Sequence, residues 1–119
     1  MSWYILDDNL NPVPEPDILK AARWFEDAKN RKVVVTEIDE NCYLSTVFLS
    51  LDHGYLSDRP ILYESLWFGG PHDGEQRRYS TREEALEGHK EMLADAGYSC
   101  VVVDQRQSWK IGLVSLLTE

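Results

Sequence analysis

The stretch from Ser80 to Gly97 constrains the fold most, because it marks both ends of one helix. Its start offers two overlapping capping boxes, Ser80 with Glu83 and Thr81 with Glu84. In each box the hydroxyl accepts the backbone amide of the glutamate, and the glutamate carboxylate accepts the backbone amide of the hydroxyl residue. An apolar stripe follows at helical spacing, formed by Ala85, Leu86, His89, Met92, Leu93 and Ala96. Gly97 suits the left-handed cap that ends a helix. The sequence therefore predicts an amphipathic helix that must pack against another element.

Three segments before this helix are rich in β-branched and aromatic residues and predict strands. They are Lys32–Ile38, Cys42–Leu51 and Ile61–Phe68. Asp39–Asn41 is typical of a turn, so the first two segments are expected to form a hairpin. Gln76–Tyr79 could return antiparallel to the third. These patterns indicate an antiparallel sheet beside the helix.

The N-terminal part of the chain predicts one strand and one helix. Ser2–Leu6 suits an edge strand, and the prolines of residues 11–16 suit an extended connection. Asp17 can cap a helix, which is expected to end near Asn30.

Tyr98–Val103 predicts another strand near the C-terminus, whereas Trp109–Leu117 fits either a strand or a helix. Residues 105–119 could also be a tail that swaps between subunits. The resulting order is β-α-βββ-α-ββ, which predicts an α+β fold in which two helices pack on an antiparallel sheet. A chain of 119 residues is expected to form a single domain, residues 1–119.

The segment LWFGGPHDGEQRRY, residues 66–79, raises the question of whether it is a catalytic loop or a tight turn. Gly69 and Gly70 permit backbone torsions closed to other residues, and Asp73-Gly74 is a strong turn dipeptide. Backbone requirements thus explain most of the segment, and we interpret it as a constrained hairpin turn. Its polar remainder comprises His72, Glu75, Gln76, Arg77 and Arg78.

Four motifs give the chain a family resemblance. They are FGGPHDGEQRRYST at 68–81, EEALEGH at 83–89, ARWFE at 22–26 and LSTVFLSLDH at 44–53. With these motifs, residues 2–95 resemble a family of small uncharacterised proteins carried by tailed phages and prophages. The resemblance implies an origin in a phage-like genome. It implies no activity and transfers no functional residue.

The charge balance limits the partners. Twenty-one acidic residues against twelve Lys and Arg give a net charge of −9. Such a protein is expected to avoid direct contact with nucleic acid and anionic membranes and to attract basic proteins. The start, MSWYILDDN, has no signal-peptide pattern, and Cys42 and Cys100 match no zinc or disulfide spacing. We therefore expect a cytoplasmic protein without a metal or other cofactor.

The outer face of the helix after Ser80 carries the candidate binding residues. They are Glu83, Glu84, Glu87, Glu91 and Asp95, with Arg82 and Lys90 interrupting the row. Carboxylates on successive helical turns lie roughly 6 Å apart, similar to phosphates along a nucleic-acid strand. The row could therefore occupy a basic groove of another protein. An ordinary solvated helix face is the alternative.

Catalytic chemistry has weaker candidates, and no motif assembles a catalytic site. His89 lies in the apolar stripe, where it could face Glu64 or Glu37 as an acid–base pair, or simply bond to a strand side chain. A metal or acid–base site could use Asp52, His53, His72, Asp73 and Glu75. The loops that hold these residues flank opposite ends of one strand, which argues against their meeting.

These observations favour a phage-type accessory protein that is not an enzyme and binds a host or phage protein. An acidic inhibitor of a host factor or of host defence is its sharpest form. A small metal-dependent or acid–base hydrolase is one alternative. A virion or assembly component is another, with Trp109–Leu117 as an apolar contact in a homodimer or larger assembly.

Overall fold

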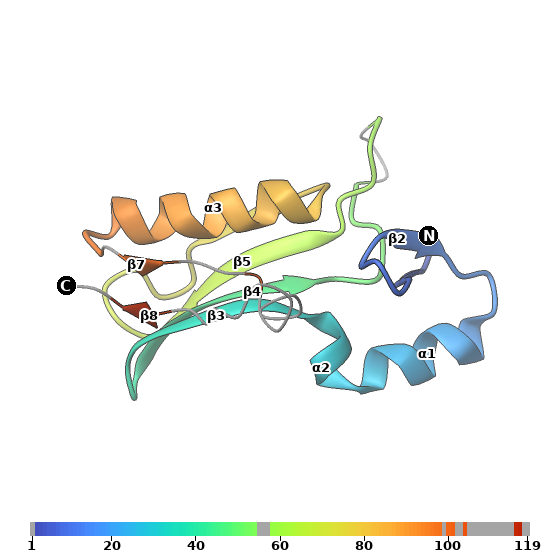
Figure 1. The fold of residues 1–119 in the computed structure, drawn as a ribbon, viewed down its shortest axis with the longest axis horizontal. Helices are drawn as coiled ribbons and strands as arrows, with labels where there is room; N and C mark the ends of the chain where they lie inside the picture. Colours follow the sequence, from blue (N-terminus) through green and yellow to red (C-terminus); the bar gives the residue numbers. More distant parts are fainter. Residues whose placement is uncertain (1, 55–57, 99, 102–103, 105–115, 118–119) are drawn as a thin grey trace.

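A four-stranded antiparallel sheet with a helix along one face forms the centre of the protein (Figure 1). The computed structural model describes residues 2–54, 58–98, 100, 101, 104, 116 and 117. The strands are β3 (Lys32–Asp39), β4 (Cys42–Phe48), β5 (Tyr63–Phe68) and β6 (Gln76–Tyr79), and they neighbour one another in that order. The helix is α3 (Arg82–Asp95). The predicted hairpin of the first two strands and the antiparallel return of the fourth are both confirmed.

The N-terminal strand pairs differently from its prediction. β1 (Tyr4–Leu6) pairs with β2 (Pro12–Pro14), the segment expected to be only a connection. It meets the chain just beyond β4 through an isolated antiparallel bridge between Trp3 and Leu51 and the backbone hydrogen bonds beside it. A two-stranded ribbon tolerates proline because one side of each strand needs no amide donor. The carboxylate of Asp7 accepts the amides of Asn9 and Asn11 and so fixes the turn between the strands.

The first predicted helix is divided into two. α1 (Ile18–Glu26) begins at Asp17, whose carboxylate accepts the amides of Leu19 and Lys20 as expected. Asp27 then leaves the helical conformation, and its carboxylate accepts the amide of Lys29 at 3.0 Å. A second cap inside the predicted helix therefore starts a separate short helix, α2 (Ala28–Arg31).

The C-terminal part forms a third ribbon. β7 (Cys100–Val101) pairs antiparallel with β8 (Leu116–Leu117). Both predicted C-terminal segments thus contain strand residues. The alternatives of a helix or a swapped tail rest mainly on residues 105–115, which lie outside the described residues. The α+β class is confirmed, but the described residues contain three sheets and three helices where one sheet and two helices were predicted.

Two apolar clusters pack on the sheet, one toward each end of α3, and the first of them also includes Leu6 and Leu10 of the N-terminal ribbon. The first contains Leu6, Leu10, Val33, Val34, Phe48, Leu62, Tyr63 and Ala85, and the second contains Cys42, Leu44, Trp67, Met92 and Leu93. Four buried polar side chains occupy the positions between them: Thr36, Thr46, Ser65 and His89, here called the polar layer. On each of β3, β4 and β5 the hydroxyl lies at the inward position between two apolar inward residues.

The glycine-rich segment after β5 is a tight hairpin loop. Gly69 and Gly70 have φ angles of 77° and 75°, and Gly74 has 86°. The amide of Gly69 donates to the carboxylate of Asp73 at 2.7 Å, and the amide of Gly74 donates to the carbonyl of Trp67 at 2.9 Å. Backbone geometry thus accounts for the glycines and the aspartate, as the sequence predicts.

Candidate functional site

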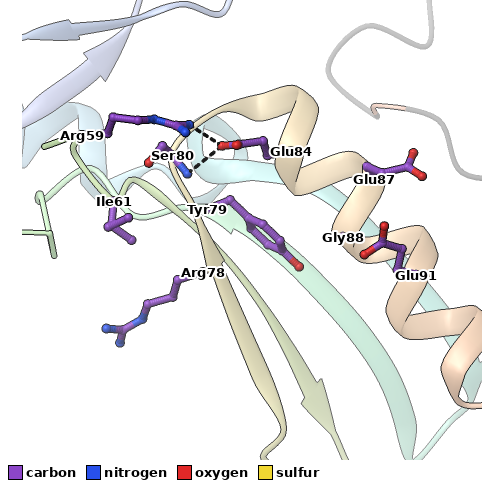
Figure 2. Close-up of a pocket in the computed structure, with 9 residues that line it drawn as sticks. All are labelled: Arg59, Ile61, Arg78, Tyr79, Ser80, Glu84, Glu87, Gly88 and Glu91. Carbon is purple, nitrogen blue, oxygen red and sulfur yellow. Dashed lines mark hydrogen bonds and ion pairs between the residues drawn. The ribbon is translucent and has the colours of Figure 1, made fainter. Parts of the chain in front are cut away.

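A groove on the surface lies between α3 and β6 (Figure 2). Its volume is about 390 Å³. It is lined by Arg59, Ile61, Arg78, Tyr79, Ser80, Glu84, Glu87, Gly88 and Glu91, a set we call the α3–β6 groove. Both charge signs line it, with the carboxylates on the helix and the guanidinium groups on the strand side.

The helix start shapes one end of the groove. Of the two predicted capping boxes, Thr81 with Glu84 is the one that forms: the Thr81 hydroxyl accepts the amide of Glu84 at 3.1 Å. The Glu84 carboxylate accepts the amides of Ser80 and Thr81 and pairs with Arg59 at 2.7 Å (Figure 2). The hydrogen bond from Arg59, followed by those from the backbone, lowers the pKa of Glu84. Glu84 therefore holds the helix and the groove wall together.

Tyr79 and Gly88 form the floor of the groove. The Tyr79 ring reaches from β6 toward α3 (Figure 2). Its hydroxyl donates to Ser65 at 3.2 Å. A Cβ atom on Gly88 would lie 2.2 Å from the Tyr79 hydroxyl and from Cε1. Burial raises the pKa of Tyr79, so the hydroxyl stays protonated and available as a donor. Gly88 is thus required by close approach of an aromatic ring.

Substituting Gly88→Ala is expected to lower the free energy of unfolding by about 1–2 kcal/mol, because the added methyl group must displace Tyr79. In a Tyr79→Ala background the same substitution should instead raise it by about 0.5–1 kcal/mol, through better helix propensity. Urea unfolding of the four proteins measures both effects. An equal effect of Gly88→Ala in the two backgrounds would show that the ring contact is not the reason for the glycine.

The predicted acidic row is partly neutralised. Glu84, Glu87 and Glu91 line the groove, whereas Glu83 is exposed outside it. Arg77 pairs with Asp95 at 2.7 Å and, more loosely, with Glu91 at 3.4 Å. The neutralising arginine belongs to β6, so the sequence of the helix alone does not predict these ion pairs.

Arg82 does not interrupt the outer face, contrary to the sequence-based expectation. Its side chain is buried, and its guanidinium group forms a two-pronged ion pair with Asp104, with Nη2 at 2.7 Å from Oδ1. A cation next to two exposed glutamates in the sequence has therefore turned inward, because a buried carboxylate compensates its charge.

His89 is fully buried and bonded to two strand side chains. Its Nε2 lies 2.8 Å from the Thr36 hydroxyl and its Nδ1 lies 2.7 Å from the Thr46 hydroxyl. Thr46 contacts Ser65 at 2.5 Å, so the polar layer continues to Tyr79. Burial lowers the pKa of His89 from 6.5 to about 4. At neutral pH the imidazole is uncharged and both nitrogens are occupied, as in the alternative of a bonded core histidine.

The predicted pairing of His89 with Glu64 or Glu37 is wrong. Glu64 lies on the opposite face of β5 from Ser65, and its carboxylate pairs with Arg78 at 3.0 Å. Glu37 is exposed on β3, next in sequence to the inward Thr36. Side chains alternate between the two faces of a strand, and in β5 the inward ones are Tyr63, Ser65 and Trp67. Ser65, and not Glu64, therefore lies on the same side of the sheet as His89.

The remaining candidates form no common site. The carboxylate of Asp52 accepts the amides of Gly54 and Ile61, and His53 beside it is exposed. In the other loop, His72 Nδ1 lies 2.6 Å from Glu75, while Asp73 caps the amide of Gly69.

Three further observations concern chemistry and environment. No group of three or more His, Cys, Asp and Glu residues that could hold a metal ion occurs in the described residues. Burial, followed by the charges of Asp39 and Asp73, raises the pKa of the buried Cys42 thiol, which disfavours the reactive thiolate. Among the described residues, no helix has the length and apolar character needed to cross a membrane.

Sequence patterns missed the strand side of the groove. Arg78 and Tyr79 lie in β6, and the pairing of β6 with β5 places them beside the helix. Arg59 and Ile61 come from the loop that precedes β5. Comparison with models of protein families, with curated proteins and with solved structures found no match.

Proposed function

We propose that this protein is a non-enzymatic binding module that holds a basic segment of another protein in the α3–β6 groove. One observation carries the proposal: Glu87 lines the groove, is exposed, and forms no hydrogen bond or ion pair with any described residue. A carboxylate in this setting can pair with an incoming Lys or Arg without breaking an internal contact.

Glu91 supports the same role. Its contact with Arg77 is long, at 3.4 Å, and exposed, so it contributes little to stability and can be exchanged for a partner's cation. Arg77 retains Asp95 at 2.7 Å when that exchange occurs. The groove therefore offers two adjacent carboxylates, one helical turn apart, while Glu84 keeps its structural contacts.

Net charge and sequence resemblance support the class of partner. A net charge of −9 favours encounter with a basic protein surface. The phage-like origin expected from the sequence motifs leads us to propose a host-cell protein as the partner. Recognition in the groove is favoured over imitation of a whole nucleic-acid strand, since Arg59 pairs with Glu84 near one end of the acidic row and Arg77 pairs with Asp95 at the other.

Charge reversal tests the proposal. The double variant Glu87→Lys and Glu91→Lys is expected to lose the proteins that the wild-type chain retains from a host lysate, by at least about tenfold. The matched control is Glu26→Lys with Glu40→Lys, which changes the net charge equally at exposed positions outside the groove. Quantitative mass spectrometry of the three captures compares them. If both double variants lose the captured proteins equally, binding depends on the net charge alone, and this result would contradict a site in the groove.

A further inference from the structure

A second concave site lies where the N-terminal segment, α1, α2 and the end of β4 meet. It has a volume of about 230 Å³. Its lining consists of Trp3, Phe25, Arg31, Val47, Phe48, Leu49, Leu51 and His53, here called the Trp3–Phe25 pocket. It shares none of these residues with the α3–β6 groove. We propose that this pocket binds a small aromatic carboxylate, with the ring in the apolar interior and the carboxylate on Arg31.

Aromatic side chains build the apolar interior. The Trp3 and Phe25 rings meet edge to face, with centroids 6.0 Å apart and an interplanar angle of 76°. Val47 and Phe48 come from β4, so rigid sheet backbone forms the opposite wall. A volume of 230 Å³ is below the range of about 300–1,000 Å³ typical of drug-sized ligands. The pocket therefore suits one ring with a short side arm.

Arg31 is held in position with donors to spare. Its guanidinium carbon lies 4.2 Å from the centroid of the Phe25 ring, and its Nε donates to the Phe25 carbonyl at 2.9 Å. The terminal Nη1 and Nη2 form no hydrogen bond with any described residue. Stacking and one hydrogen bond thus fix the planar group, and its two terminal nitrogens match a carboxylate in a two-pronged arrangement.

The charge of the lining selects an anion. Arg31 and His53 are the only titratable residues in it, and it contains no carboxylate, although the whole chain carries −9. Asp52, which lies between the lining residues Leu51 and His53 in sequence, uses its carboxylate on the amides of Gly54 and Ile61. A cationic lining in an acidic protein is the complement of an apolar anion.

Paired ligands that differ only in charge test the site: 3-phenylpropanoate and its neutral amide. Titrations are followed by the indole N–H resonance of Trp3 in NMR spectra. The carboxylate is expected to bind at least about fivefold more tightly than the amide. Arg31→Gln should bring the carboxylate down to the affinity of the amide and leave the amide's affinity unchanged, which shows that the pocket stays intact. Arg23→Gln, the same charge change at an exposed position of α1 outside the pocket, should keep the preference.

Several results would overturn the proposal: no shift of the Trp3 resonance with either ligand, equal affinity for the two in the wild-type protein, or a preference that survives Arg31→Gln. Should Arg31→Gln also lose the amide, Arg31→Met keeps an unbranched apolar stem over Phe25 and decides the matter. Loss of the preference in Arg31→Met supports the site, and its persistence contradicts it.

Discussion

Gly69→Ala is expected to lower the free energy of unfolding by roughly 4 kcal/mol, among the largest effects of any single substitution in this chain. The φ angle of Gly69 is 77°, a conformation that costs an alanine about 1–2 kcal/mol. The added Cβ would also lie 1.8 Å from the backbone carbonyl oxygen of Asn41, in the turn between β3 and β4. That backbone cannot withdraw without disturbing the hairpin, so the loop itself must move.

Gly74→Ala is the matched control. Its φ angle is 86°, yet a Cβ there meets no atom within 4 Å, so we expect a loss of only about 1 kcal/mol. Guanidinium chloride unfolding of the three proteins gives the comparison through the midpoints and slopes. Similar losses for Gly69→Ala and Gly74→Ala would mean that the contact with Asn41 does not constrain the loop.

The buried His89 is expected to make stability depend on pH. Its pKa is about 4 in the folded protein and 6.5 when unfolded, so the unfolded state binds more protons between these values. The associated stability is fully present above pH 6.5 and is lost as the pH falls toward 4. The whole shift corresponds to about 3 kcal/mol, of which about 2 kcal/mol should disappear between pH 7 and pH 5.

His89→Gln isolates this contribution, because glutamine can bond to the threonine hydroxyls but does not titrate. The variant should be less stable than wild type at pH 7, and the difference should shrink by about 2 kcal/mol at pH 5. Urea unfolding at the two pH values measures it, and contributions of the exposed acids cancel between the proteins. If the difference in free energy of unfolding between the two proteins is the same at both pH values, the group that takes up the proton on unfolding is not His89.

Local signals in the sequence predicted much of the fold. The helix after Ser80 and the hairpin turn at Gly69–Gly74 follow from capping and backbone torsions, which depend on neighbouring residues only. The cap at Asp27 could have been found in the same way, since aspartate is among the residues preferred at the start of a helix. The separate N-terminal ribbon could not, because which strands pair is a long-range choice.

The candidate sites depend on contacts between residues that are far apart in the sequence. On three successive strands, a hydroxyl residue occupies a position that the alternating pattern assigns to the apolar, inward face. This pattern could have revealed the polar layer around His89. The predicted pairing of His89 with Glu64 is wrong because Tyr63, Ser65 and Trp67 are the inward residues of β5, so Glu64 lies on the other face. The groove needed the pairing of β5 with β6, and Arg59 enters it from a loop whose path no local rule fixes.

The most direct test of binding in the α3–β6 groove is an NMR titration of the protein with the partner recovered by capture. The groove is lined by the Ile61 side chain and by Gly88, whereas Gly74 lies in the hairpin loop. We predict that the Ile61 methyl resonances and the Gly88 amide shift on binding while the Gly74 amide stays in place. Shifts confined to residues 69–75, with Ile61 and Gly88 unchanged, would contradict the proposal and assign recognition to the loop.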